Sequence, residues 1–455
     1  MSKLKYMKNI KKIILATVVL FSSSCSDSFL DVNPTQSVSN ESVIVDGATA
    51  QTAVLGVYSK MQSSSYYGGD GYAATACLSS GDHIWVGTLN YYNAFPSHTY
   101  RADNTLLNNV WNQIFTTING ANNVIERVNA LPETKITNAL KNQYVGEAYF
   151  IRALAYFDLA RAWGNIPLVL KPTVSPTDFA GVKQSTQKQV YQQALKDLDT
   201  AENLLPATIN RNRATKKTVY ALKARIYLYN EDWQKAIDYS SLIIGDSNYE
   251  LVSWPTILNN LNTKESIFEL AFNTADQSAH FGSWSSKDYR NQFAPGPVIF
   301  NDLQNATNSG DRKQLIQDNS SPAIRNYFVQ KLYWRATGEN PTYILRLSEQ
   351  YLIRAEAYLK IATPNAALSL QDLNKVRVRA NVTPLNISNP QLLLGAIASE
   401  RRLEFAFEPH RWFDLTRTKK AGEVLGVTDS NLWIFPIPFN DLEADDDLEQ
   451  NPGYN

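Results

Sequence analysis

Cysteine, methionine and histidine are scarce in this chain of 455 residues, which contains two Cys, three Met and four His. The His residues stand far apart, at positions 83, 98, 280 and 410, and no HExxH or CxxC pattern occurs. We therefore expect no catalytic transition-metal site. A Gly-rich phosphate loop and a GxSxG nucleophile motif are also missing. The chain thus carries no common catalytic motif, and we predict that it is not an enzyme and needs no cofactor.

Charge is also low, because charged residues make up 19% of the chain against about 25% in typical soluble domains. Hydrophobic residues make up 44%, and this combination excludes disorder over most of the length. The 43 basic and 43 acidic residues cancel, which argues against nucleic acid as the main partner. Aromatic residues reach 11% and include 24 Tyr. The composition predicts a sizeable core and no strongly charged partner.

No apolar run approaches the roughly 18 residues of a membrane-spanning helix. The apolar run at 13–21 follows a basic segment and precedes three Ser and Cys25. This order is typical of a secretory signal, so we predict a signal peptide over 1–24. The position of Cys25 resembles a bacterial lipobox, which predicts lipidation of Cys25 and a lipidated tether over 25–45. The alternative is an ordinary signal peptide with an incidental Cys. The remaining Cys77 cannot form an intrachain disulfide without Cys25.

Apolar residues recur at helical spacing through much of the chain. The pattern predicts helices at 47–61, 106–131, 137–163, 187–205, 215–245, 342–361, 364–380 and 390–408. We expect irregular structure over 62–105 and 250–310, with short strands at 266–272 and 297–300, and an extended tail after 430. Strand signals are few, and the predicted fold class is therefore mainly α with long irregular loops and a few short β-hairpins.

A spaced pattern of Tyr and Ala, Tyr-x3-Ala-x2-Tyr, occurs three times within the predicted helices. Its Ala residues are Ala153, Ala224 and Ala355, and a further Ala follows the last two copies at Ala236 and Ala367. A small residue lets two antiparallel helices approach closely while Tyr fills the space beside it. This is the arrangement of tetratricopeptide-repeat hairpins. We predict close helix crossings at Ala153, Ala224 and Ala355.

Several segments, in this order along the chain, resemble the SusD/RagB family of Bacteroidota outer-membrane lipoproteins. They are Cys25 followed by SDSFLDVNP, YFIRALAYFDLARAWGNIPLV (149–169), ALKARIYLYNEDWQKAIDYSSLII (221–244), LRLSEQYLIRAEAYLK (345–360) with ALSLQDLNKVRVRA (367–380), ERRLEFAFEPHRWFDLTR (400–417) and FPIPFNDLEADDDLEQNPGY (435–454). The resemblance covers nearly the whole chain. It implies a SusD-like single large unit, with an N-terminal region at 46–250 and a C-terminal region at 251–455.

The same resemblance implies a function at the cell surface. A protein of this family would be lipid-anchored in the outer membrane, bind nutrient glycans (oligosaccharides) and deliver them to a SusC-like TonB-dependent transporter. One branch of the family implies an alternative, a peptide-binding RagB-like lipoprotein. A protein-docking scaffold and a secreted glycoside hydrolase remain further alternatives.

Charged residues concentrate at 400–417 and at Asp445–Asp447. Two carboxylates of the first segment could form the acid/base pair of a glycosidase. We favour a structural ion-pair network, because neighbouring Arg residues would depress the carboxylate pKa values that a general acid needs raised. The three consecutive Asp residues could bind Ca²⁺, although such a run on a loop is more often solvated.

Two aromatic-rich windows with little charge, 62–105 and 273–300, are the best candidates for a glycan site. Aromatic rings stack on the apolar faces of sugars, while neighbouring polar side chains bind hydroxyls. We predict ligand contacts from Trp85, Trp284, Asp82, His83, Asn90, Tyr91, Tyr92, Tyr289 and Arg290. The alternative for any single aromatic residue is that it packs its loop onto the body of the protein.

Overall fold

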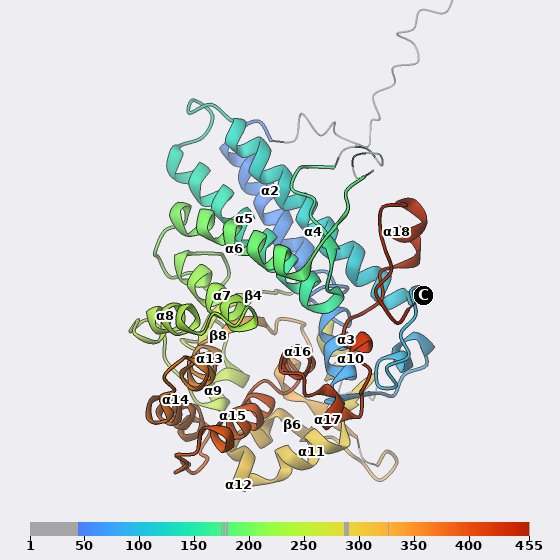
Figure 1. The fold of residues 1–455 in the computed structure, drawn as a ribbon, viewed down its shortest axis with the longest axis vertical. Helices are drawn as coiled ribbons and strands as arrows, with labels where there is room; N and C mark the ends of the chain where they lie inside the picture. The colour runs from blue at the N-terminus through green and yellow to red at the C-terminus, as the bar shows by residue number, and fades with distance from the viewer. Residues whose placement is uncertain are drawn as a thin grey trace, which may run out of the picture. The chain divides into compact units, whose positions relative to one another are not determined.

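Antiparallel helices make up most of the fold (Figure 1). The structure is a computed structural model that describes residues 44–173, 175, 178, 181–285, 291–325 and 327–454. Val45–Asn455 form one compact unit, and Met1–Ile44 form a second that lies almost wholly outside the described residues. The predicted signal peptide and Cys25 lie outside them too. Within the described ranges, no helix has the length and apolar character needed to cross a bilayer.

A stack of helices runs through the unit from its N-terminal to its C-terminal part. Its helices are α2 (Gly47–Met61), α4 (Thr105–Ala130), α5 (Asn138–Trp163), α6 (Gln187–Leu204), α7 (Lys216–Tyr229), α8 (Trp233–Ile244), α13 (Leu347–Lys360), α14 (Ala366–Arg379) and α15 (Pro390–Glu404). Each helix packs against the next in this order, and α2 packs against α5 as well as α4. The stack therefore passes directly from α8 to α13, across about a hundred intervening residues (Figure 1).

Local sequence explains where the long helices begin and end. Asn104 caps α4 by accepting hydrogen bonds from the backbone N–H groups of Leu106 and Leu107. Thr186 and Gln189 form a reciprocal capping box at the start of α6. The helix α5 ends at Gly164, whose φ of 75° favours a residue without a Cβ. The predicted boundaries of these helices are confirmed because the stop and start signals are local.

The Tyr/Ala repeats mark real helix crossings. Ala153, Ala224 and Ala355 are completely buried. Ala224 and Ala236 lie in one core cluster with Ile353, which joins the hairpin α7–α8 to α13. The predicted crossings at Ala224 and Ala355 are confirmed, and the burial of Ala153 in α5 agrees with the third.

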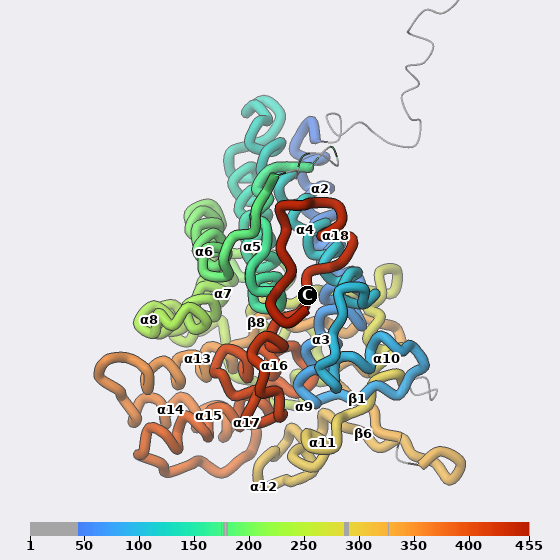
Figure 2. Tube along the Cα trace, turned by 45° about the vertical axis from the view of Figure 1, so that its right-hand side comes forward, coloured from blue at the N-terminus to red at the C-terminus, as the bar shows by residue number. Residues whose placement is uncertain are grey.

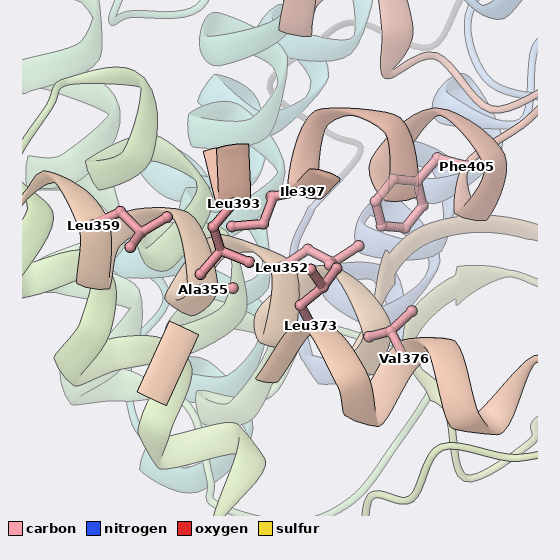
Figure 3. Packing of buried hydrophobic residues seen from close by; sticks show 8 residues of the cluster. All are labelled: Leu352, Ala355, Leu359, Leu373, Val376, Leu393, Ile397 and Phe405. Carbon is pink, nitrogen blue, oxygen red and sulfur yellow. The ribbon is translucent and has the colours of Figure 1, made fainter. Parts of the chain in front are cut away.

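Ala367, which follows the third repeat, is exposed on α14 and is not the small residue at the Ala355 crossing. The small residue at that crossing is Ser369, which is fully buried and donates a hydrogen bond to the carbonyl of Ala355 at 2.7 Å. Around this contact, α13, α14 and α15 bury an apolar cluster that includes Leu352, Leu373 and Ile397 (Figure 3). At the α13–α14 crossing the small group is therefore the hydrogen-bonded hydroxyl of Ser369, whereas in the α7–α8 hairpin it is the methyl group of Ala236.

Short strands pair in twos and connect distant parts of the chain. They are β1 (His83–Trp85) with β5 (Phe293–Pro295), β2 (Ile166–Pro167) with β3 (Gln184–Ser185), β4 (Ser266–Leu270) with β8 (Thr342–Arg346), and β6 (Ile316–Asp318) with β7 (Phe328–Gln330), all antiparallel. The pairs β1–β5 and β4–β8 are long-range pairings and not hairpins. The strand predicted at 266–272 is confirmed as β4.

Three local predictions are corrected by the structure. Residues 297–300 begin a helix, α11, because Pro297 at its first position has the fixed φ that starts a helix. Residues 342–346 are not helical but form β8, whose β-branched and aromatic residues pair with β4. The region 62–105 contains a fully buried helix, α3 (Tyr72–Ser79), as well as β1.

The remaining helices are short and connect the parts described above. They are α9 (Trp254–Asn259), α10 (His280–Trp284), α11 (Pro297–Gln304), α12 (Ala306–Ser309), α16 (Arg411–Arg417), α17 (Ala421–Leu425) and α18 (Phe439–Ala444), with 3-10 turns η3 (Asn90–Ala94), η5 (Gly310–Leu315), η6 (Lys331–Tyr333) and η7 (Ser430–Trp433). The tail after 430 is thus extended only in part. Figure 2 shows it returning along the N-terminal helices, so that α18 lies beside α4.

Candidate functional site

The two aromatic windows meet at the β1–β5 pair. Trp85 lies opposite Phe293 in the register, and His83 lies opposite Pro295. A backbone hydrogen bond of 2.9 Å from Val86 to the carbonyl of Gln292 extends the pairing. Segments about 200 residues apart therefore form one surface, which the sequence predicted as two separate candidates.

Trp85 is the half-buried centre of this surface. Its ring stacks on Tyr92 with centroids 4.1 Å apart, and Phe293 packs edge-on against both rings. Gly87 lets the chain pass close to the indole, because a Cβ there would lie 2.3 Å from a Trp85 ring carbon. The ring is therefore held in one orientation before any ligand arrives.

The surroundings of Trp85 are unusually exposed for apolar side chains. Ile84 is 38% exposed, Val86 52% and Leu89 45%. Asn90 is exposed and Tyr91 is half-buried next to Tyr92, with ring centroids 4.7 Å apart. We call Trp85, Leu89, Asn90 and Tyr91 the platform. Ile84 and Val86 are next to Trp85 along the extended strand, so their side chains point to its other side. Leu89 was not among the predicted site residues.

Two predicted contact residues lie beneath this surface instead. Trp284 is 0% exposed, and its indole N–H donates to Asp70 at 2.8 Å. His83 is buried between the rings of Trp284 and Phe407. The structure therefore corrects the expectation that Trp284 and His83 meet ligand directly, because neighbouring rings cover both. Both support the platform from below.

Asp82 and Tyr92 are also covered. Asp82 is 1% exposed and pairs with Arg402 at 3.2 Å, so its carboxylate faces the interior and not the platform. Tyr92 is 5% exposed and carries the Trp85 ring. These two residues position the platform. Tyr289 and Arg290 lie outside the described residues, and their predicted contacts stay predictions, as do those of Trp85, Asn90 and Tyr91.

Buried titratable groups lie directly behind the platform. Burial raises the pKa of Asp70 to about 6, although Ser283 and Trp284 donate hydrogen bonds that favour the carboxylate. Burial also lowers the pKa of His83 to about 4 and that of His280 to about 3. The two imidazoles are therefore neutral at physiological pH and act as packing rings.

Other aromatic residues of the first window belong to the core. The hydroxyls of Tyr66 and Tyr67 donate to Asp158 at 2.7 and 2.6 Å, and Tyr72 also contacts this carboxylate. Arg161 completes the cluster with an ion pair to Asp158 at 2.6 Å. For these three Tyr residues, the packing interpretation of the sequence is correct.

The charged segment 400–417 forms the predicted ion-pair network. Carboxylates of this segment pair with Arg residues from inside and outside it. The buried ion pairs of the network are Arg346 with Glu265, Glu404 and Glu408, Arg312 with Glu400 and Glu404, Arg379 with Glu265 and Glu404, Arg401 with Asp414, and Arg417 with Glu356 and Asp414. Burial by itself would raise the pKa of Glu404. The positive charges of Arg379, Arg312 and Arg346 outweigh this effect and lower the pKa to about 2. The expected depression does not extend to Glu408, where burial raises the pKa despite Arg346.

Metal-binding potential is low in the part of the chain that the structure describes. No group of three or more His, Cys, Asp or Glu residues there is placed to hold a metal ion. Within the Asp445–Asp447 run, Asp445 accepts the backbone N–H of Asp447 at 3.0 Å, which is an ordinary loop contact.

Two family models match the chain. One, described as starch-binding and associating with the outer membrane, matches residues 28–228, and another, described as the SusD family, matches residues 299–431. The chain belongs to the SusD/RagB family. The resemblance inferred from the sequence is thereby confirmed, and so is the mainly helical SusD-like fold. The descriptions make this a carbohydrate-binding family associated with the outer membrane.

Full-length relatives and solved structures agree with this membership. SusD-like protein P2 of Formosa agariphila is 26% identical over 97% of this chain and 99% of its own. A SusD superfamily protein from Bacteroides thetaiotaomicron superposes with a TM-score of 0.78 at 23% identity, over 90% of this chain and 100% of its own. A laminarin-binding SusD-like protein superposes with a TM-score of 0.76 at 24% identity, with the same coverage.

Proposed function

We propose that this protein binds glycans at the cell surface and delivers them to a SusC-like TonB-dependent transporter in the outer membrane. The observation that carries the proposal is the platform, in which a fixed, half-buried Trp85 lies among exposed apolar and amide side chains. The family membership supports a carbohydrate as the ligand.

The chemistry of the platform fits a sugar ring. The exposed part of the half-buried indole provides an apolar surface for the C–H groups of a sugar, and the exposed Asn90 amide can both donate to and accept from hydroxyls. Tyr91 adds a second half-buried ring beside it. The carboxylates of 400–417, which were the candidates for an acid/base pair, are buried in the ion-pair network with Arg residues and do not belong to the platform. This arrangement supports binding without catalysis.

Affinity is expected to be modest. If about 80 Å² of an aromatic ring faces sugar, burial at ~25 cal/mol/Å² contributes roughly 2 kcal/mol. Two such rings and a few hydrogen bonds, less the cost of association, correspond to a Kd of about 10 μM to 1 mM. An affinity in this range allows capture followed by release to a transporter.

Glycan titrations of the mature protein test the proposal. Laminarin-derived and starch-derived oligosaccharides are suitable first probes, because a laminarin-binding structure and a starch-binding family model match the chain. Trp85→Ala should weaken binding by about thirtyfold, which corresponds to the loss of roughly 2 kcal/mol. Asn90→Ala, at an exposed position, should weaken binding without affecting folding.

A matched control separates ligand contact from general damage. Trp233→Ala removes another half-buried Trp, on α8, and should leave glycan affinity unchanged. Unchanged affinity in both Trp85→Ala and Asn90→Ala would contradict the proposed site. A peptide library screened in parallel tests the RagB-like alternative, and selective peptide binding with no glycan binding would replace the proposal.

Delivery to the transporter has its own test. The protein should co-purify with a SusC-like transporter from outer membranes, and Trp85→Ala should do so equally well if docking does not use the platform. Failure of the wild-type protein to co-purify would contradict the delivery step while leaving glycan binding intact.

A further inference from the structure

A cavity of about 580 Å³ lies apart from the platform. Its walls are one side of α4, the residues Pro167, Val169, Thr173 and Val182, and α18 with Asp445 and Leu448 that follow it. None of the residues that line it belongs to β1, η3 or β5. Its volume falls within the range of small-molecule sites, about 300–1,000 Å³. We propose that this cavity is a second carbohydrate site, which takes a short, neutral glycan segment.

One face of α4 supplies most of the chemistry. Asn112, Phe115, Thr116 and Asn119 line the cavity from positions i, i+3, i+4 and i+7, which share one side of a helix. Phe115 is half-buried and leans on the buried Trp111, with centroids 4.8 Å apart. The exposed part of its ring can therefore stack on a sugar, flanked along the helix by amide and hydroxyl groups.

Two carboxylates stand on the opposite wall. Asp441 accepts the indole N–H of Trp111 at 3.1 Å, which fixes the orientation of its carboxyl group. Asp445, half-buried, is oriented by the backbone N–H of Asp447. Carboxylates held in this way accept hydrogen bonds from ligand hydroxyls without having to be ordered on binding.

The charges select the class of ligand. Among the described residues, the lining contains Asp441 and Asp445 and no Lys, Arg or His, so sulfated or uronate glycans would be repelled. A basic peptide could also pair with the carboxylates, and it is therefore the competing ligand in the experiment below. A neutral polyhydroxylated ligand uses the exposed Asn112 amide, the carboxylate acceptors and the Phe115 ring together. The lining therefore disfavours anionic glycans, and the family membership supports a neutral glycan as the ligand.

Isothermal titration of the mature protein with neutral laminarin and starch oligosaccharides tests the second site. Wild type should show two sites, and Trp85→Ala should retain the cavity site. In the Trp85→Ala background, Ala444→Trp should fill the cavity from its exposed rim and reduce the remaining affinity at least about tenfold. Phe115→Ala should have a similar effect, because it removes the stacking face.

The adjacent exposed position provides the control. Glu443→Trp places the same ring one residue away, at a position that does not line the cavity, and should leave this affinity unchanged. Equal binding by the Ala444→Trp and Glu443→Trp proteins, or no binding by the Trp85→Ala protein, would overturn the proposal. Binding of an oligo-lysine peptide that Ala444→Trp abolishes, without glycan binding, would also overturn it. If only binding at the platform is lost, glycan binding at the cavity is still measured. The two proposals can therefore fail independently of each other.

Discussion

Trp284, at the end of α10, joins this helix to the loop at Asp70 through one hydrogen bond, and its ring makes several further contacts. Its ring packs against His83, His280, Phe293 and Tyr333. Trp85 lies on the other side of Phe293, where it is only half-buried. The platform thus depends on a second aromatic layer below it.

Replacing Trp284 by Ala should therefore act on stability first. Removal of a fully buried Trp typically costs about 3–5 kcal/mol, because a cavity remains where the ring was. Chemical unfolding followed by circular dichroism measures this cost. Trp85→Ala serves as the comparison and should destabilise the protein much less. Equal and small losses for the two variants would show that Trp284 is not a core residue.

Asp70 makes stability depend on pH in a predictable direction. Its pKa is about 6 in the folded protein because of burial, and about 3.9 in the unfolded chain. Between about pH 4 and pH 6 the folded state binds more protons, so the free energy of unfolding falls as pH rises through this window. The full effect, about two pKa units, is at most roughly 3 kcal/mol.

The variant Asp70→Asn isolates this contribution, because the amide oxygen can still accept from Trp284 but does not ionise. Denaturation at pH 4 to 7 should show that wild type loses stability relative to Asp70→Asn as pH rises, with no further divergence above about pH 7. Parallel pH profiles for the two proteins would mean that Asp70 does not titrate in this range.

At the scale of the element, close helix crossings hold the stack together. Ala224 on α7 is completely buried against Ala236 of α8 and Ile353 of α13. Replacing Ala224 by Leu should overpack this crossing and cost about 1–3 kcal/mol. Thermal unfolding measures the difference.

The exposed Ala367 on α14 provides the matched control. Ala367→Leu makes the same change outside the crossing, and its effect should stay within about 0.5 kcal/mol. If the two variants melt together at the wild-type temperature, the helices at Ala224 are not in close contact.

At the scale of the whole molecule, attachment to the membrane depends on the N-terminal segment. We propose that Cys25 is acylated, because it follows a basic, apolar and small-residue leader. Metabolic labelling with a palmitate analogue should mark the wild type and not Cys25→Ala. The variant should leave the outer-membrane fraction, since several acyl chains on one Cys are needed for a stable anchor. Equal labelling of both proteins would contradict acylation at this residue.

The long helices, their caps and the Tyr/Ala crossings could be predicted because their signals are local. Helical periodicity, an Asn or Thr cap and a terminal Gly act within a few residues along the chain. The family could be recognised for a related reason, since its motifs are continuous segments in a constant order. The errors at 297–300 and 342–346 arose where a short apolar run fits either a helix or a strand.

The amino-acid sequence by itself therefore determined the family, the helical stack and the aromatic windows. Only the tertiary structure decided which aromatic rings face outward. Trp85 and Trp284 both stand beside polar residues in Gly- and Ser-containing loops, yet one is half-buried and the other fully covered. That difference follows from the pairing of β1 with β5 and from long-range contacts such as the hydrogen bond of Trp284 to Asp70, 214 positions away. Burial is a property of long-range packing, and no local pattern encodes it.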